Sequence, residues 1–351
     1  MKKKVLIAPL NWGLGHATRC IPIINALIKE GLTPVIASDG AALDLLKKEF
    51  PDTETKELPS YNIEYSKTAN TFKLKMVLNS PKIVRAIKAE KKAIEELVAK
   101  DHYHGIISDN RLGVRHRNVP SVFITHQLTV LSGKTTALST KIHNKYIKKF
   151  DVCWVPDMAD SPNLSGVLGH PKKVKLPVTY LGPLSRFCYQ DLPKEYDIMV
   201  LLSGPEPQRT LLENKLFKEF KQSDKRIVFI RGLIEETHKT YHKDNITVHN
   251  FLTGKDLQNT INSSSLIISR SGYTTVMDLA KLNKRAFFIP TPGQSEQEYL
   301  ADRLNSNKIA PSCKQQDFSL KELYKLSSYK GLSSFSTDID YGELFHFFQR
   351  K

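Results

Sequence analysis

Residues 265–282 read SLIISRSGYTTVMDLAKL. The short apolar run at 265–269 suits a buried strand, and apolar residues recur at helical spacing from 274 to 283. A strand that passes into a helix through a tight turn is the repeating unit of a parallel α/β sheet. This stretch therefore predicts one strand–turn–helix unit, with Ser-Arg-Ser-Gly in its turn.

The same alternation runs through most of the 351 residues, which are enough for two domains. We predict the α/β class, with two Rossmann-like parallel-sheet domains facing across a cleft where the strands end. The domains are expected at 1–182 and 196–335, with a linker at 183–195 and a C-terminal helix at 336–351 that packs back on the first domain. Expected strands lie at 4–10, 34–39, 105–110, 121–127, 152–157, 197–203, 226–232, 246–252, 265–269 and 286–291, and expected helices at 18–31, 41–50, 67–100, 138–150, 206–222, 254–263, 274–283 and 295–306.

The bulk properties favour a cytoplasmic protein. No apolar run approaches the ~20 residues that cross a bilayer, and the first apolar run is too short for a signal peptide. The four cysteines are far apart, which argues against a disulfide framework or a cysteine metal site.

The formal charge of +16 favours anionic partners. Residues 67–100 carry nine Lys or Arg against three Glu, with apolar residues between them. Two interpretations stay open for this segment: a solvated amphipathic helix, or a surface that rests on an anionic membrane. Nucleic acid is not expected as a partner, because no RNP1, KH or zinc-knuckle pattern is present.

The loop NWGLGHATR, residues 11–19, joins the first predicted strand to the first predicted helix. Gly13 and Gly15 let a ligand approach the backbone, and the helix N-terminus suits a phosphate or a developing anion. His16 should be neutral there, because the helix dipole opposes an imidazolium. It is a candidate general base, and the alternative is a histidine that only caps the helix.

Two loops of the second predicted domain carry groups that suit a nucleoside diphosphate. In the loop 202–210, Ser203 and Gly204 offer hydroxyl and backbone donors, with Arg209 nearby, although a plain proline-rich turn is an equal alternative. In the opening stretch, Gly272 permits close approach to the backbone. The remaining candidates in that stretch are Ser271 and Tyr273 before the helix, Thr274 or Thr275 as its cap, and Asp278 as an acceptor for ribose hydroxyls.

A third loop, 290–300, places Gln297 and Glu298 at the start of the next predicted helix. We expect both side chains to face the same ligand. The alternative is an ordinary acid-rich first turn.

Residues 269–304, SRSGYTTVMDLAKLNKRAFFIPTPGQSEQEYLADRL, resemble the nucleotide-sugar signature of GT-B glycosyltransferases, in particular that of the family containing MurG. The loop GLGHATRCIPI at 13–23 is similar to the N-terminal glycine–histidine loop of that family. The resemblance implies the GT-B fold and a UDP-sugar donor. It also implies site roles for Asp278 on the ribose, Gln297 on the sugar, Phe251 and Leu252 on the uracil, Ser203, Gly204, Ser271 and Gly272 around the diphosphate, and His126 and Gln127 on the acceptor, whereas Glu298 replaces a second glutamine.

The chemistry that this resemblance implies is inverting sugar transfer to a lipid-linked or other membrane-proximal acceptor. No DxD pair is placed to hold a divalent ion between the domains, so neither a metal nor a cofactor besides the UDP-sugar is expected. His16 would take the proton of the attacking hydroxyl, or else Asp109, which is also interpretable as a structural acid. The alternative is a nucleotide-sugar hydrolase or epimerase on the same fold, because GHATRC also resembles a UDP-sugar hydrolase.

Overall fold

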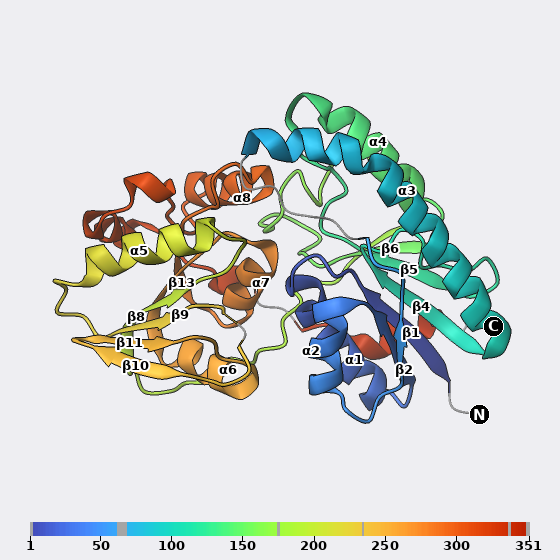
Figure 1. Ribbon diagram of the computed structural model, residues 1–351, viewed down its shortest axis with the longest axis horizontal. Coiled ribbons are helices and arrows are strands. Elements are labelled where there is room, and N and C mark those ends of the chain that lie inside the picture. The colour runs from blue at the N-terminus through green and yellow to red at the C-terminus, as the bar shows by residue number, and fades with distance from the viewer. Residues whose placement is uncertain (1–2, 62–68, 174–175, 234, 336–337, 349–351) are drawn as a thin grey trace. The chain divides into compact units, whose positions relative to one another are not determined.

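The computed structural model describes residues 3–61, 69–173, 176–233, 235–335 and 338–348. The chain divides into two compact units (Figure 1). The first comprises Met1–Glu64, Phe72–Arg186 and Thr337–Lys351, and the second comprises Tyr65–Thr71 and Phe187–Ser336. The boundary after Arg186 falls within the predicted linker, and the C-terminal segment returns to the first unit.

The first unit is built on a seven-stranded sheet with the order β3-β2-β1-β4-β5-β6-β7, and all of its pairs are parallel. Because parallel strands end at the same edge, the loops after β1, β4 and β5 lie side by side. The strands are β1 Lys4–Pro9, β2 Thr33–Ser38, β3 Thr55–Glu57, β4 Tyr103–Asp109, β5 Ser121–Ile124, β6 Val152–Val155 and β7 Val178–Tyr180.

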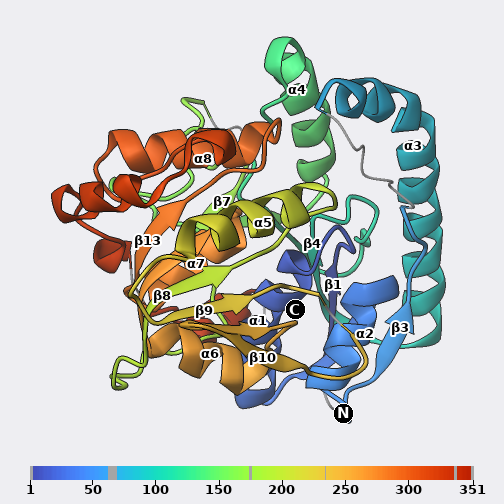
Figure 2. The ribbon, with the colours of Figure 1, turned by 60° about the vertical axis from the view of Figure 1, so that its left-hand side comes forward.

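Helices cover both faces of this sheet, as the buried strands of a parallel sheet require. Leu6 and Ala8 of β1 pack with Ile94 of α3 (Ala69–Lys100) in one apolar cluster. The alternate residues Val5 and Ile7 are fully buried and face the other side, where α1 (Gly15–Lys29) and α2 (Gly40–Glu49) lie (Figure 2). The remaining elements are the 3₁₀ turn Gly133–Thr135 and α4 (Thr136–Ile147).

The C-terminal segment completes the core of the first unit. It forms the short helix α9 (Tyr341–Phe345), followed by a 3₁₀ turn at His346–Phe348. Phe345 and Phe348 are almost fully buried, and the Phe348 ring lies against the backbone of Gly105 and 6.1 Å from the Trp154 ring. The packing of this segment is therefore aromatic and apolar.

The second unit has a six-stranded sheet with the order β10-β11-β9-β8-β12-β13, in which only the β10–β11 pair is antiparallel. One face packs against α5 and the 3₁₀ segments, and α6 and α7 cover the other (Figure 1). The strands are β8 Tyr196–Leu201, β9 Ile227–Ile230, β10 Thr240–Lys243, β11 Ile246–His249, β12 Ser264–Ser269 and β13 Arg285–Phe288. The helices are α5 Gln208–Phe220, α6 Gly254–Asn262, α7 Tyr273–Lys281 and α8 Ser295–Ser306, with 3₁₀ segments at Gln315–Asp317, Leu320–Ser328 and Ser333–Phe335.

The predicted α/β class with two parallel-sheet domains is confirmed. Three strands were not predicted, namely β3, β7 and β10. The first two have three residues each, too few for a periodic pattern, and all four residues of β10 are exposed. None of the helices in the described part of the chain is long and apolar enough to cross a membrane.

Candidate active site

His16 lies where β1 gives way to α1. Gly13 has a φ of +76°, and a Cβ there would meet no atom within 4 Å, so the loop leaves open space beside its backbone. Leu14 occupies the N-cap position, and no side chain caps this helix. The Nδ1 atom of His16 lies 2.8 Å from Oδ1 of Asp109 instead. These observations contradict the interpretation of His16 as a helix cap.

Asp109 is the last residue of β4, and it pairs in register with Pro9 at the end of β1. Its side chain is fully buried, and Arg19 of α1 donates to both of its carboxylate oxygens through Nε and Nη2. Burial raises the pKa of Asp109, but Arg19 and His16 outweigh it, and the pKa falls well below its usual range. Asp109 is therefore an ionised, inaccessible group that orients His16, and its predicted alternative role as the base is not supported.

The imidazole of His16 is partly exposed, with 16% of the side-chain surface accessible. Burial lowers the pKa of His16, the Asp109 carboxylate opposes that change, and Arg19 and His126 add to it. The predicted neutral imidazole is thus supported, but the causes are burial and Arg19 rather than the helix dipole alone. A neutral imidazole on Asp109 can accept a proton at Nε2.

The predicted acceptor residue His126 belongs to the same group of side chains. It follows β5, is 5% exposed, and its Nδ1 atom lies 3.3 Å from Nη1 of Arg19. We call His16, Arg19, Asp109 and His126 the histidine cluster. Gln127 is half-buried, and its backbone N–H donates to Oγ1 of Thr125 at 3.0 Å.

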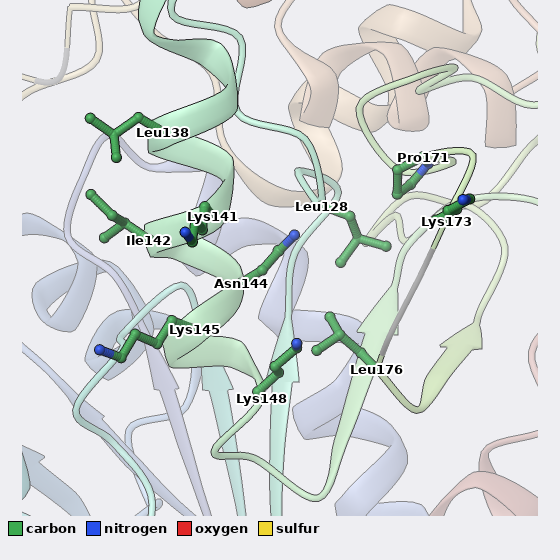
Figure 3. A pocket seen from close by; sticks show the side chains of 10 residues that line it. All are labelled: Leu128, Leu138, Lys141, Ile142, Asn144, Lys145, Lys148, Pro171, Lys173 and Leu176. Atoms are coloured by element: carbon green, nitrogen blue, oxygen red, sulfur yellow. The ribbon is translucent and has the colours of Figure 1, made fainter.

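A cavity of about 610 Å³ lies in the first unit between α4 on one side and Pro171, Lys173 and Leu176 on the other (Figure 3). Asn144 of α4 and Lys148, which directly follows that helix, point toward Leu128 and Leu176. The Oδ1 atom of Asn144 is buried without a hydrogen-bond partner among the described residues. No acid is among the ten residues that line it: Leu128, Leu138, Lys141, Ile142, Asn144, Lys145, Lys148, Pro171, Lys173 and Leu176. The cavity thus combines an apolar floor with a cationic rim.

In the second unit, the loops after β8, β12 and β13 meet at one edge of the sheet. Ser269 pairs in register with Leu201 on one side and with Phe288 on the other. Arg270, 1% exposed, joins the three loops, because its guanidinium donates to the carbonyls of Gln208, Ile289 and Pro290. This edge is therefore a fixed platform of three loop ends.

The turn at Ser271–Gly272 opens α7 as the sequence predicts. A Cβ on Gly272 would meet nothing within 4 Å, so a ligand can approach the backbone and the helix N-terminus. Ser271 is buried, and its hydroxyl donates to the carbonyl of Gln297 at 2.7 Å, so it braces the turn. Tyr273 is also buried, at 3% exposure, and belongs to the packing of α7.

The predicted threonine cap of α7 is wrong. Gly272 is the N-cap, without a side-chain hydrogen bond, and Thr274 and Thr275 lie inside the helix. Both threonines and Asp278 are half-buried, whereas the residues between them pack into the core. Because residues three and four apart are neighbours on a helix surface, the two threonines and Asp278 share one face of α7.

Gln297 and Glu298 hold the loop that precedes α8. The Oε1 atom of Gln297 accepts the backbone N–H of Thr291 at 2.9 Å, and Oε1 of Glu298 accepts that of Gly293 at 2.8 Å. Their direct role toward a sugar stays a prediction. The structure adds a bracing role for both, which accounts for their place in the first turn.

The loop after β8 fits the prediction only in part. Gly204 has a φ of +100° and lies beside Thr291, and Ser203 is exposed next to it. Arg209 was predicted to reach the diphosphate, but it is 5% exposed and donates to Glu206 and to Glu213. A donor-binding role for Arg209 is therefore not supported, because its buried guanidinium already pairs with the exposed Glu206 and the buried Glu213.

The predicted uracil segment lies between β11 and α6. Phe251 and Leu252 are half-buried. The backbone N–H of Phe251 donates to Oδ1 of Asn250 at 3.0 Å, so this donor is already used. Contacts from Leu252 to a base stay a prediction.

The basic segment 67–100 is a helix as far as the structure describes it. Residues 67–68 lie outside the described residues, as do the side chains of 69–80. In the remaining part, Ile87 and Ile94 are buried, and Lys91 and Lys92 are exposed with glutamates four residues on. This part matches the solvated amphipathic helix, because its apolar face is buried within the unit.

Comparison with known proteins shows which glycosyltransferases the chain resembles. Residues 206–328 match the glycosyltransferase family 28 C-terminal domain, and this range contains the loops after β12 and β13 and begins within the loop after β8. The chain is 25% identical over 337 residues to a UDP-N-acetylglucosamine–N-acetylmuramyl-(pentapeptide) pyrophosphoryl-undecaprenol N-acetylglucosamine transferase of Glaesserella parasuis, covering 93% of this chain and 89% of the relative. The matched domain, this relative and the fold together support a MurG-like GT-B glycosyltransferase.

Two further similarities support the same assignment. A transferase of the same description from Haemophilus ducreyi is 25% identical over 222 residues, a match that spans 61% of this chain and 59% of that protein. The crystal structure of Acinetobacter baumannii MurG superposes with a TM-score of 0.59 at 15% identity over the full length of both chains. At that identity the likeness shows the fold, and the fold is the one that the sequence resemblance implied.

Two important residues of this glycosyltransferase escaped the sequence analysis, Arg19 and Arg270. Both are among the largest fully buried side chains, which is unusual for arginine. In a single sequence an arginine in a helix or a loop gives no sign of burial. The partners of the two guanidinium groups become visible only in the structure, where the loops that follow neighbouring strands lie side by side.

Proposed function

We propose that the chain transfers a sugar from a UDP-sugar to a hydroxyl of a phosphate-bearing lipid, with inversion at the anomeric carbon and without a metal ion. The observation that carries the proposal is the 2.8 Å contact between His16 Nδ1 and the buried carboxylate of Asp109. A histidine held in this way presents Nε2 as a base beside an open glycine loop.

The proposed step balances as a direct displacement. With its Nδ1 hydrogen on Asp109, His16 accepts the proton of the acceptor hydroxyl at Nε2. The acceptor oxygen bonds to the anomeric carbon while the bond from that carbon to the β-phosphate oxygen breaks. UDP leaves with the electron pair, and a single backside attack inverts the centre.

The donor side of the proposal uses the second unit. The exposed backbone at Gly272 and the N-terminus of α7 supply N–H groups for the diphosphate, so negative charge on the leaving group needs no cation. Asp278, on the face of Thr274 and Thr275, is placed to accept ribose hydroxyls. The choice of a UDP-sugar, and of N-acetylglucosamine as the first sugar to test, rests on the activities in the names of the relatives.

The acceptor side of the proposal uses the cavity beside α4. Lys141, Lys145, Lys148 and Lys173 favour a phosphorylated headgroup, and the leucine floor favours the start of its hydrocarbon chain. We propose a cytoplasmic enzyme that meets this acceptor at the membrane surface through α4. The earlier expectation of contact through residues 67–100 is less supported, since Ile87 and Ile94 of that helix pack inward.

The deciding experiment follows release of UDP from UDP-sugars with and without a membrane lipid extract. Release that depends on the extract supports transfer, and a glycosylated lipid should appear in step with it. Release in water alone supports the alternative, a nucleotide-sugar hydrolase. Saturable binding of UDP without release from any sugar nucleotide would contradict both enzymatic assignments.

A further inference from the structure

Arg19 is the one member of the histidine cluster that contacts the other three described members. Its Nε and Nη2 atoms donate to the two oxygens of Asp109, Nη2 lies 2.8 Å from His16 Nδ1, and Nη1 lies 3.3 Å from His126 Nδ1. The residue is 2% exposed, so a ligand reaches it only through its neighbours. Whatever Arg19 does for the reaction, it does through His16 and Asp109.

Hydrogen-bond chemistry restricts the arrangement around His16. A guanidinium only donates and an ionised carboxylate only accepts. His16 Nδ1 lies 2.8 Å from one of each, so it binds Asp109 if it carries the hydrogen and Arg19 if it does not. Only the first tautomer leaves Nε2 with a lone pair toward the outside.

The charges decide how basic that lone pair is. The groups that face His16 are Asp109 from β4, Arg19 from α1 and His126 from the loop after β5. A lone buried carboxylate beside a histidine favours the imidazolium, which cannot accept a proton. A bidentate guanidinium on the same carboxylate cancels most of that attraction and keeps the carboxylate ionised despite its burial.

We propose that Arg19 is a positioning residue that neutralises Asp109, so that the carboxylate fixes the tautomer of His16 without protonating it. The inference rests on the proposed role of His16 as the base. His16, Asp109 and Arg19 of the histidine cluster thus form a triad in which Arg19 already pairs with the carboxylate that contacts His16. His16 then stays a neutral base at pH values where a simple His–Asp pair would be protonated.

The test titrates His16 by NMR in histidine-labelled protein, with its signals assigned by comparison with His16→Gln. In Arg19→Met the pair of His16 and Asp109 should take up a proton at higher pH, which moves the midpoint of the His16 titration upward by about one to three pH units. In Asp109→Asn the unpaired guanidinium should move it below the wild-type midpoint. Arg19→Lys retains the charge and should keep the midpoint near that of the wild type.

The matched control is Arg111→Met. Arg111 is also fully buried and paired with two carboxylates, Glu90 and Asp39, and among the described residues it forms no hydrogen bond or ion pair with His16. It should lose comparable stability without moving the His16 midpoint. Equal midpoints in folded Arg19→Met, Asp109→Asn and wild type would overturn the proposal, and Asp109→Asn alone decides if Arg19→Met does not fold.

Activity separates this inference from the proposed function. If transfer occurs, the acid limb of the kcat/KM profile should move with the His16 midpoint in Arg19→Met, while the KM for UDP-sugar changes little. If no variant and no wild-type sample releases UDP while the midpoints still move, the proposed function fails and the electrostatic role of Arg19 stands. If transfer is normal in Arg19→Met at every pH, the positioning role is wrong.

Discussion

At the scale of single residues, replacing His16 should affect catalysis but not binding of the donor. We predict that His16→Ala lowers turnover by ~10²–10⁴-fold, the usual contribution of a general base. UDP affinity should stay within a few-fold, because the donor loops belong to the second unit. Rates of UDP release and calorimetric titration with UDP measure the two quantities.

The control for this prediction is His102→Ala, since His102 is an exposed histidine of the same unit. It should retain wild-type turnover. A His16→Ala protein that loses UDP binding together with turnover would contradict the assignment and make His16 a structural residue.

His143 gives the first unit an acid-sensitive position. Its Nε2 atom is buried without a partner among the described residues, and burial, with a smaller effect of His126, lowers its pKa to about 4. In the unfolded chain, His143 takes up a proton near the ordinary pKa of histidine, so protonation favours unfolding. The full unfolding free energy is therefore present at neutral pH and decreases as the pH falls toward 4. Between pH 7 and pH 5 the loss should be about 2 kcal/mol of unfolding free energy.

Replacing this group tests the prediction. His143→Leu should reduce the difference in unfolding free energy between pH 7 and pH 5, measured by urea titration at both values. The replacement keeps an apolar contact with Phe123, whose ring lies 5.9 Å from that of His143. An unchanged difference would show that His143 is already protonated, or accessible to water, in the folded state.

The sequence predicted the residues whose chemistry is local, and the structure decided those that depend on distant partners. His16 and Gly272 were found because a glycine turn before a helix is visible in a few consecutive letters. The arginines behaved otherwise: Arg209 was assigned to a ligand although Glu206 and Glu213 hold it. The pairing of Arg19 with Asp109, 90 residues away, has no local signal.

At the scale of elements, α4 is the helix that we expect to meet the acceptor. The double variant Lys145→Glu, Lys148→Glu reverses two charges on the cationic rim of the cavity. It should lower the transfer rate with a phosphorylated lipid acceptor at least tenfold and leave UDP affinity unchanged, because the donor loops are elsewhere. The rate should also lose its sensitivity to salt.

The matched control lies on α3. Lys91→Glu, Lys92→Glu changes the same charge on a helix where both lysines already have glutamate neighbours, so little change in rate is expected. If the α3 variant loses transfer and the α4 variant does not, the acceptor meets α3 and the assignment of the cavity is wrong.

Helices and strands with a clear hydrophobic period were predictable from the sequence. Segments that take their structure only from contact with a neighbouring element were not. Strand β12 and helix α7 follow from the opening stretch alone. Strand β3 has only half-buried or exposed residues, and it exists because β2 offers it a parallel edge. The 3₁₀ segments between Gln315 and Phe335 likewise depend on the apolar face that α5 leaves to them.

At the scale of the whole molecule, the C-terminal segment is part of the first unit. We predict that Phe348→Ala lowers the unfolding free energy of that unit by ~3–5 kcal/mol, because it leaves a cavity beside Gly105 and Trp154. UDP binding by the second unit should persist below the lowered melting temperature. Calorimetry with and without UDP measures both effects.

Tyr324→Ala is the control, since Tyr324 is an aromatic residue with 83% of its surface exposed. It should leave both melting behaviour and binding as they are. Loss of UDP binding in Phe348→Ala at a temperature where the protein is folded would mean that the two units do not behave as separate bodies.

The discontinuous first unit also constrains how the protein is made. A ribosome delivers residues 3–186 first, but the aromatic rings that fill the hollow beside Gly105 emerge only after the whole second unit. In the newly made chain, the apolar surface of β4 and β6 that Phe348 later covers therefore stays exposed while about 150 further residues are added. Substitutions at Phe345 and Phe348 should therefore increase the need for chaperones during synthesis before they change the rate of the enzyme.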